Sequence, residues 1–345
     1  MFTSLLGALA LVTSSDKPSE PDQAIAQTLD QAVFSGIVLV TQGETVLSQI
    51  VQGEAGPDLS MAPQLDWMWA SLTKQVMAVA AMRLIEENRL ALDAPLSDYA
   101  PDLPLTSSDQ ITVRDLLRHT TGLPDYDDLP PERFRTGFDP DIYCFGPLKS
   151  APGGTFDYNN CDTWVLGRVL EGIYGADIET VLTELVFLPA GMTETRLGDA
   201  QDFGDVAGRA VEGGWIRPID LGLFGPAAGL VGPVHDLVRF NAALMDGRLL
   251  SEASRAELWR GEPERGYVAL GAWSFPAPLN GCDGALNLIE RRGSLSGVEI
   301  RSLMAPALNR SLIMYSNQGD PGYGEIWMGE GLSYELASLA FCPER

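Results

Sequence analysis

The segment that most constrains the fold is a helical pattern at residues 71–88. Its first half, residues 76–82, is apolar on nearly every face, and a helix that is hydrophobic all round belongs in a protein interior. The residues that open it, 71–75, are mostly polar. We therefore predict that this helix lies in the middle of the fold, an unusual position for a helix with a polar beginning.

Strand patterns lie at both ends of the chain, and helical patterns lie between them. Residues 36–41 and 45–51 are rich in Val and Ile and predict a hairpin that turns at 42–44. Further strands are predicted near the other end, at 267–274, 286–290, 297–304 and 311–316. Helices are predicted at 25–33, 113–118, 161–173, 178–187, 235–245 and 334–341.

These patterns predict an α/β (α+β) fold. Strands from both ends can join in one antiparallel sheet flanked by helices, with a mainly helical second lobe alongside. We assign residues 1–20 to a leader and 21–345 to one domain, with a sheet lobe at about 25–90 and 250–345 and a helical lobe at about 91–249. The cleft between the lobes is the default place for a ligand.

The charge of the chain argues against two classes of partner. The formal net charge of −24 repels phosphate backbones and anionic lipid surfaces. We expect a small-molecule or peptide substrate, no nucleic acid, and a monomer. Only three of the 23 basic residues are lysines, Lys17, Lys74 and Lys149, which draws attention to any lysine in a motif.

The beginning of the chain resembles an export leader. Residues 1–12 form an apolar run of signal-peptide length, too short to span a bilayer, and small and polar residues follow. The positive residues that usually precede such a run are absent, so a buried N-terminus is the alternative. We predict a periplasmic or secreted protein with no stable membrane insertion after removal of the leader.

The cysteines predict two disulfides if the protein is exported. Four cysteines allow three pairings, and none of them has a CxxC spacing. Closeness in sequence favours Cys144 with Cys161, which leaves Cys282 with Cys342. Four separate buried thiols are the alternative.

The first chemical motif is S-x-x-K at Ser71 and Lys74. Residues three apart share a helix face, so the hydroxyl and the amine can meet. The start of a helix also offers free N–H groups and a positive dipole end to a developing oxyanion. For Lys74 to accept a proton, its pKa must fall by about three units, through partial burial and a nearby second cation. The alternative is that Ser71 caps a helix and Lys74 is solvated.

The second motif is Y-x-N, at Tyr158 and Asn160. A tyrosine hydroxyl beside a lysine can relay a proton to a leaving group, and an asparagine amide can hold both the lysine and a substrate carbonyl. Alone, this motif fits an ordinary loop tyrosine equally well.

Together these motifs resemble the class C β-lactamase family. The matching stretches are WASLTK at 69–74, LLRHTTGLP at 116–124, PGG at 152–154 leading to YNN at 158–160, and PAGMT at 189–193. The similarity runs from about residue 35 to about residue 318, in the order of the family, which also includes penicillin-binding DD-peptidases, esterases and D-aminopeptidases. The resemblance implies the serine β-lactamase and DD-peptidase-like fold and an acyl-enzyme intermediate.

Carried over residue by residue, the resemblance makes Ser71 the nucleophile and gives Lys74 and Tyr158 the general-base and general-acid work, beside Asn160. No cofactor or metal is implied. Tyr126, two residues after the LLRHTTGLP stretch, is a further candidate for substrate binding.

The third family element, a cationic K-T-G or H-x-G on an edge strand, is altered here. The matching stretch is Arg291-Arg292-Gly293, followed by Ser294, so Arg291 stands where the family has lysine or histidine. Arginine keeps a positive charge for a substrate carboxylate but cannot give up a proton. By resemblance, the N–H of Ser294 would join that of Ser71 in an oxyanion hole, and Gly293 would admit the substrate backbone. A shifted alignment puts Ser294 at the cationic position and removes the charge.

Other functions are weaker interpretations. No G-x-S-x-G elbow accompanies the two histidines, His119 and His235, so we predict structural roles for both. They also lack the clustered ligands of a zinc site, which argues against a metal-dependent hydrolase. The main alternative to an ester- or amide-cleaving enzyme is a penicillin-binding sensor that is acylated without efficient release, and the altered third motif motivates it.

Overall fold

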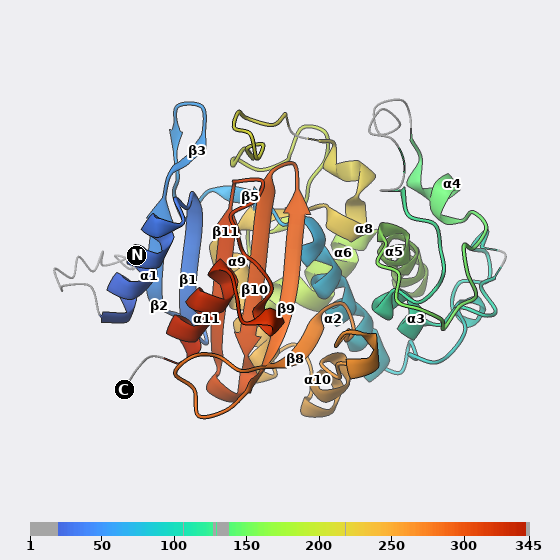
Figure 1. The fold of residues 1–345 in the computed structure, drawn as a ribbon. Coiled ribbons are helices and arrows are strands. Elements are labelled where there is room, and N and C mark those ends of the chain that lie inside the picture. Colours follow the sequence, from blue (N-terminus) through green and yellow to red (C-terminus); the bar gives the residue numbers. More distant parts are fainter. Residues whose placement is uncertain (1–19, 106, 127–128, 130–137, 218, 343–345) are drawn as a thin grey trace, which may run out of the picture.

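A six-stranded antiparallel sheet forms the centre of the protein (Figure 1). The computed structural model describes residues 20–105, 107–126, 129, 138–217 and 219–342. The strand order is β2-β1-β11-β10-β9-β8, and the strands are β1 (Gly36–Gln42), β2 (Thr45–Gln52), β8 (Trp273–Ala277), β9 (Leu286–Leu295), β10 (Val298–Ala305) and β11 (Arg310–Ser316). The N-terminal hairpin joins the C-terminal strands where β1 pairs with β11, with Gly36 opposite Ser316. The prediction of one sheet built from both ends is confirmed.

Side chains alternate between the two faces of this sheet, as a period of two requires. In β1, Ile37 and Leu39 belong to the larger hydrophobic core on one face, and Val38 and Val40 belong to the smaller core on the other. Helices α1 (Glu20–Gln31) and α11 (Leu332–Phe341) pack together over the smaller core (Figure 1). Helix α9 (Val234–Asp246) packs on β11 from the opposite face.

Helix α2 (Thr73–Glu86) runs through the larger core. Its residues Thr73 to Met82 are all buried, because α5 (Asn160–Tyr174), α6 (Ile178–Leu182), α8 (Gly225–Ala228) and α10 (Glu252–Leu258) contact it. The predicted central position of this helix is confirmed. It is preceded directly by a 3₁₀ turn at Ala70–Leu72.

The remaining elements are short. They are the helices α3 (Val113–Arg118), α4 (Pro140–Cys144) and α7 (Leu188–Ala190), the π-helical segment Thr183–Phe187, the strands β3 (Glu54–Gly56) and β4 (Leu59–Ser60), and the 3₁₀ turns Leu96–Asp98, Leu221–Leu223, Pro263–Arg265, Pro306–Leu308 and Ile326–Met328. A second sheet has the order β5-β7-β6, from β5 (Asp66–Met68), β7 (Leu230–Pro233) and β6 (Arg196–Leu197). We did not predict this sheet, because strands of two to four residues are too short to show an alternating pattern.

The strand predicted at 267–274 is wrong over most of its length. Residues 267–272 lie outside the strands, apart from isolated bridges at Val268, and β8 begins at Trp273. The backbone φ angle is +64° at Tyr267 and +72° at Gly271, outside the range of strands. A Cβ atom at Gly271 would lie 2.6 Å from the Cβ of Ala78 in α2. The apolar character of this segment therefore reflects its contact with the central helix.

Both predicted disulfides are present. Cys144 bonds to Cys161 and joins α4 to α5, and Cys282 bonds to Cys342 and joins the segment before β9 to the end of α11. The predicted leader lies outside the described residues, apart from the backbone of its last one. None of the helices in the described ranges combines the length and apolar character that crossing a membrane requires.

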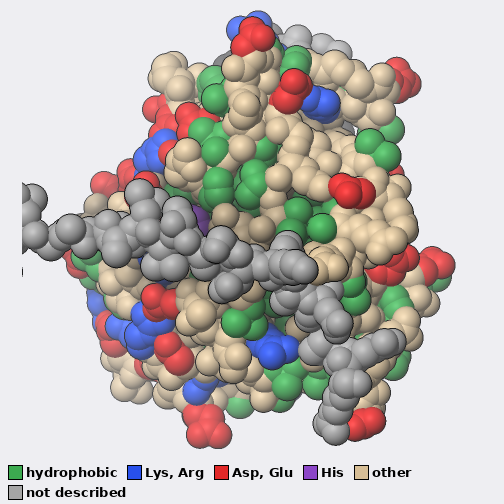
Figure 2. Space-filling view, turned by 90° about the vertical axis from the view of Figure 1, so that its left-hand side faces the viewer, with side chains coloured by type: hydrophobic (Ala, Val, Ile, Leu, Met, Phe, Trp, Pro, Cys, Tyr) green, Lys and Arg blue, Asp and Glu red, His purple; other side chains and the backbone are tan. Residues whose placement is uncertain are grey.

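Charged side chains of both signs share the molecular surface. Figure 2 shows acidic side chains scattered over one face with basic ones between them. Several arginines form ion pairs, such as Arg196 with Asp202 and Arg292 with Glu325. On that face, the basic side chains are interspersed with acidic ones.

Candidate active site

Ser71 and Lys74 meet at the beginning of the central helix. Ser71 lies in the 3₁₀ turn before α2, and Lys74 is the second residue of α2. Lys74 Nζ donates to Ser71 Oγ at 3.1 Å, to Asn160 Oδ1 at 2.6 Å and to the carbonyl oxygen of Ala227 at 2.9 Å. Lys74 is only 2% exposed, so its three ammonium hydrogens find acceptors inside the protein.

The surroundings of Lys74 lower the pKa of its amine. Burial lowers the pKa of Lys74 from its ordinary value of 10.5, the phenol oxygen of Tyr158 opposes this shift, and the positive charge of Arg291 lowers the pKa further. A neutral amine is the form that can accept a proton. Burial and a second cation are the two causes that the sequence indicated.

Hydrogen bonds to β7 hold the turn that carries Ser71. Ala70 has a φ angle of +48°, a conformation that costs an L-residue about 1–2 kcal/mol. Thr73 Oγ1 donates to the Ala70 carbonyl at 2.7 Å and accepts from the N–H of Leu230 in β7 at 3.2 Å. The N–H of Trp69 donates to the Leu230 carbonyl at 2.8 Å. The unpredicted small sheet therefore holds the serine in place.

Tyr158 completes a group of three reactive side chains. Its hydroxyl donates to Ser71 Oγ at 2.8 Å and accepts from Arg291 Nη2 at 2.9 Å. Lys74 Nζ lies 5.0 Å from the centre of the Tyr158 ring. Burial opposes ionisation of the phenol, but the positive charges of Lys74 and Arg291 outweigh it and lower the pKa of Tyr158 from 10.0 to about 8.

Asn160 is placed by the beginning of α5. The side chain of Asn159 caps this helix by accepting from the N–H of Asp162 at 2.8 Å, which fixes the neighbouring Asn160 as the first helical residue. The backbone N–H of Asn160 donates to Asp125 Oδ1 at 3.2 Å. The predicted residues Ser71, Lys74, Tyr158 and Asn160 are thus brought together.

Arg291 also belongs to this group, and it is used in a way that the sequence did not indicate. Its Nε donates to the carbonyl oxygen of Ser71 at 2.7 Å, and its Nη2 donates to the Tyr158 hydroxyl. Arg291 is 2% exposed. Arg291 therefore places its positive charge beside Ser71 and Tyr158.

Gly293 and Ser294 follow on the same strand. A Cβ atom at Gly293 would lie 2.4 Å from the carbonyl oxygen of Trp69, so only glycine fits there. The side chain of Ser294 points to the other face of the sheet and donates to Glu299 of β10. β8 pairs with β9 only as far as Glu290, so within the described residues β8 leaves that edge of β9 uncovered from residue 291 onward.

Tyr126 is not placed to contact a substrate in this structure. Its side chain is fully buried, and its ring packs between Phe138 and Phe224, with centroid separations of 5.6 and 5.8 Å. The side chain therefore offers no exposed surface to a ligand.

Sequence analysis did not predict the buried pair of His119 and Asp162, whose histidine ring contacts the ring of Tyr158. His119 Nδ1 lies 3.0 Å from Asp162 Oδ2, and the His119 ring centre is 4.6 Å from that of Tyr158. Asp162 also accepts from Thr121 and from Asn159 Nδ2. Burial holds the pKa of His119 well below its usual range, and the charges of Lys74 and Arg291 act in the same direction. His119 is therefore neutral and supports the tyrosine; its place in the LLRHTTGLP stretch was the available signal.

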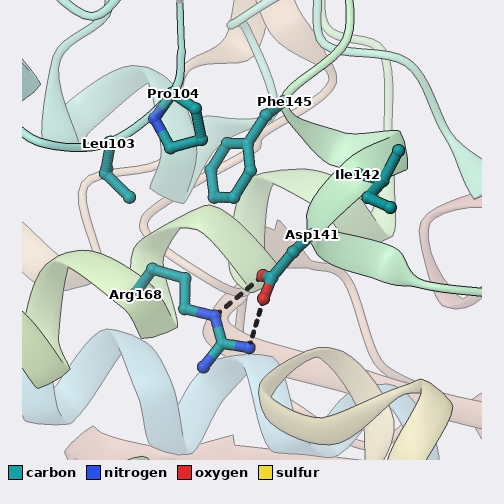
Figure 3. A pocket seen from close by; sticks show the side chains of 6 residues that line it. All are labelled: Leu103, Pro104, Asp141, Ile142, Phe145 and Arg168. Atoms are coloured by element: carbon teal, nitrogen blue, oxygen red, sulfur yellow. Dashed lines mark hydrogen bonds and ion pairs between the residues drawn. The ribbon is translucent and has the colours of Figure 1, made fainter.

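The described residues offer no cluster of three or more His, Cys, Asp or Glu side chains that could hold a metal ion. A separate cavity of about 570 Å³ lies away from the reactive group and is lined by Leu103, Pro104, Asp141, Ile142, Phe145 and Arg168 (Figure 3). On its wall, Arg168 Nε and Nη2 bind the two oxygens of Asp141, each at 2.8 Å. None of the predicted site residues lines this cavity.

Ser71 lies between a buried lysine and a tyrosine of lowered pKa, beside the edge of an antiparallel sheet. This arrangement defines the class of serine hydrolases with an S-x-x-K motif. The Beta-lactamase family model matches residues 21–327. The chain therefore belongs to the β-lactamase family and is a serine hydrolase of that family.

Known proteins of several activities are similar to this chain. It is 23% identical to the putative penicillin-binding protein PbpX of Bacillus subtilis, over 90% of this chain and 78% of that protein. It is 27% identical to esterase EstB of Burkholderia gladioli over 50% of this chain, which spans about half (48%) of EstB. The solved structure of D-amino acid amidase from Ochrobactrum anthropi SV3 superimposes with a TM-score of 0.78 at 20% identity, covering 93% of this chain and 98% of the amidase. This last likeness shows the fold alone.

Proposed function

We propose that the protein cleaves an ester or amide through an acyl-enzyme on Ser71. The observation that carries this proposal is that Ser71 Oγ lies within hydrogen-bonding distance of both Lys74 Nζ and Tyr158 Oη. Both groups have pKa values lowered toward neutral pH, which is what a catalytic base requires. Arg291 keeps its charge and serves neither as acid nor as base.

Proton transfer would proceed in two half-reactions. In the first, the neutral Lys74 amine or the Tyr158 phenolate takes the Ser71 proton while Oγ attacks the substrate carbonyl carbon. The same pair then gives a proton to the leaving alcohol or amine as the bond to carbon breaks. In the second, a water attacks the acyl carbon while the same pair takes its proton. The bond between the acyl carbon and Ser71 Oγ then breaks, Oγ regains a proton from the pair, and the carboxylic acid is released.

Hydrogen-bond donors must stabilise the negative charge of the tetrahedral intermediate. Ser71 stands in the 3₁₀ turn at the beginning of α2, where the helix dipole is positive. By resemblance to the family, the backbone N–H groups of Ser71 and Ser294 form this oxyanion hole. The absence of a side chain at Gly293 lets β9 approach the Ser71 turn closely.

The test is the mass of the intact protein after exposure to an activated ester, a fluorophosphonate or a penicillin, compared with Ser71→Ala. We expect release of p-nitrophenol from p-nitrophenyl butyrate and a fluorophosphonate adduct on the wild type, and neither with the variant. A penicillin adduct that persists without ester turnover would favour the sensor function instead. Equal labelling of wild type and variant would remove Ser71 from its role.

The same proposal covers where the protein works. The structure contains two disulfides. Because disulfides form and persist in oxidising compartments, they support a periplasmic or secreted location. The monomeric state remains a prediction, to be measured by light scattering of the purified protein.

A further inference from the structure

We infer that the substrates of this site carry no carboxylate beside the scissile bond. The inference rests on the proposed acyl-enzyme function and narrows its substrate class. By resemblance to the family, Arg291 would be the cation that binds such a carboxylate. In the structure, Arg291 instead donates hydrogen bonds to Ser71 and Tyr158 of the protein itself.

One of the two hydrogen-bonding faces with which Arg291 could bind a carboxylate is already filled. Arginine binds carboxylates most strongly through two parallel N–H groups, and Nε with Nη2 forms one such pair. Here Nε donates to the Ser71 carbonyl at 2.7 Å and Nη2 donates to Tyr158 Oη at 2.9 Å. A substrate carboxylate could take this face only by breaking both bonds, which hold the nucleophile turn and the tyrosine in place.

Aromatic rings cover the guanidinium on two sides. Its central carbon lies 5.5 Å from the centre of the Tyr158 ring and 5.4 Å from that of Trp273. The Phe156 ring lies 6.5 Å from Trp273, and both rings are partly exposed. The surface beside Arg291 is therefore aromatic and suits an uncharged, apolar group.

The neighbouring cations do not replace Arg291. Lys74 is 2% exposed, and its hydrogens are directed to acceptors within the protein. The guanidinium carbon of Arg292 lies 5.9 Å from the centre of the same Trp273 ring, but its N–H groups already bind the carboxylates of Glu290 and Glu325. The formal net charge of −24 further disfavours the approach of an anion. An ester or amide without a carboxylate near the reacting carbonyl fits this site.

A matched pair of esters tests the inference. The probes are 3-carboxyphenyl hexanoate and 3-(methoxycarbonyl)phenyl hexanoate, with rates divided by those of hydroxide hydrolysis to remove the difference in leaving group. We expect kcat/KM of the wild type to be at least about tenfold higher for the methyl ester. The opposite preference would overturn the inference and leave the Ser71 mechanism standing.

Substitution of Arg291 separates positioning from binding. Arg291→Gln should lower kcat/KM for both esters by the same factor, because the residue acts through Ser71 and Tyr158. Its pH profile should move to higher pH, since loss of the charge raises the pKa of Tyr158, and a merely structural residue would not shift it. Arg248→Gln, at an exposed ion pair with Glu44, makes the same change in net charge and should alter neither quantity.

The remaining outcomes are also decisive. A much larger loss for the carboxylate ester in Arg291→Gln would show that Arg291 binds the carboxylate and would overturn the inference. Arg291→Lys supplies a second variant if the glutamine variant does not fold, and the comparison of esters on the wild type needs no variant. Turnover of neither ester, together with an unlabelled Ser71, would overturn the proposed function and this inference with it.

Discussion

Replacement of Lys74 by methionine should separate stability from activity. Lys74→Met keeps the length of the side chain and its packing in α2 but removes the amine. The Asn160 amide oxygen and the Ala227 carbonyl then lose their hydrogen bonds from Nζ, of 2.6 and 2.9 Å. Loss of such a donor in a buried site costs about 1–3 kcal/mol for each acceptor.

The cost of burying the charge of Lys74 in the wild type opposes this loss of hydrogen bonds and has a similar size. The wild type buries a group that is 2% exposed and ordinarily charged, and burial of an ion costs several kcal/mol after relaxation. Because the variant does not pay this desolvation cost, we expect its free energy of unfolding at pH 7 to differ from that of the wild type by no more than about 2 kcal/mol. Activity should fall by about 10²–10⁴-fold, the usual contribution of a general base.

The stability difference should depend on pH in a definite direction. Since burial lowers the pKa of Lys74 in the folded chain below 10.5, the unfolded chain holds this proton more tightly. Wild-type stability therefore rises with pH between the folded and unfolded values. Tyr158 acts in the same direction, because its folded pKa of about 8 lies below 10.0. The wild type should gain stability relative to the variant from pH 7 to pH 10.

The measurements are urea unfolding at several pH values and kcat/KM on p-nitrophenyl butyrate. Lys149→Met is the matched control, because Lys149 is 38% exposed on its side chain and pairs with Asp157 at the surface; we expect a change in activity below about twofold. If Lys74→Met kept activity within tenfold of the wild type with an unchanged pH profile, the assignment of Lys74 as a proton acceptor would be refuted.

Three further predictions concern the groups around Ser71. In the wild type, kcat/KM should rise with pH and level off above about pH 8, as the Tyr158 phenolate forms; Tyr158→Phe should lose this rise and about 10²–10⁴-fold in rate, measured by pH-dependent kinetics. Gly293→Ala should lose activity and about 1–3 kcal/mol of stability in thermal unfolding, because its Cβ would lie 2.4 Å from the Trp69 carbonyl oxygen, whereas Gly172→Ala, with open space around the new Cβ in α5, should be neutral or slightly stabilising. His119→Phe should cost about 1–3 kcal/mol in urea unfolding through the hydrogen bond lost to Asp162, and an unchanged midpoint would contradict a supporting role for that pair.

Local sequence determined the elements whose signal lies within a few consecutive residues. The continuous Val- and Ile-rich run of β1 is buried on both faces of the sheet, and the unbroken apolar run of α2 is buried on all faces, so strand and helix could be predicted. The closeness of Ser71 and Lys74 follows from helix geometry alone. The two disulfides were also predictable, from closeness in sequence and the assumption of export.

Tertiary structure decided which groups from distant elements meet. Tyr158 and Arg291 reach Ser71 across separations of 87 and 220 residues, and for these the family resemblance, rather than any local pattern, gave the prediction. It could not show that both donor groups on one side of Arg291 are occupied, or that Tyr126 is enclosed between two rings. Contacts of this kind depend on the packing of loops and strands against α2, and no local periodicity encodes that packing.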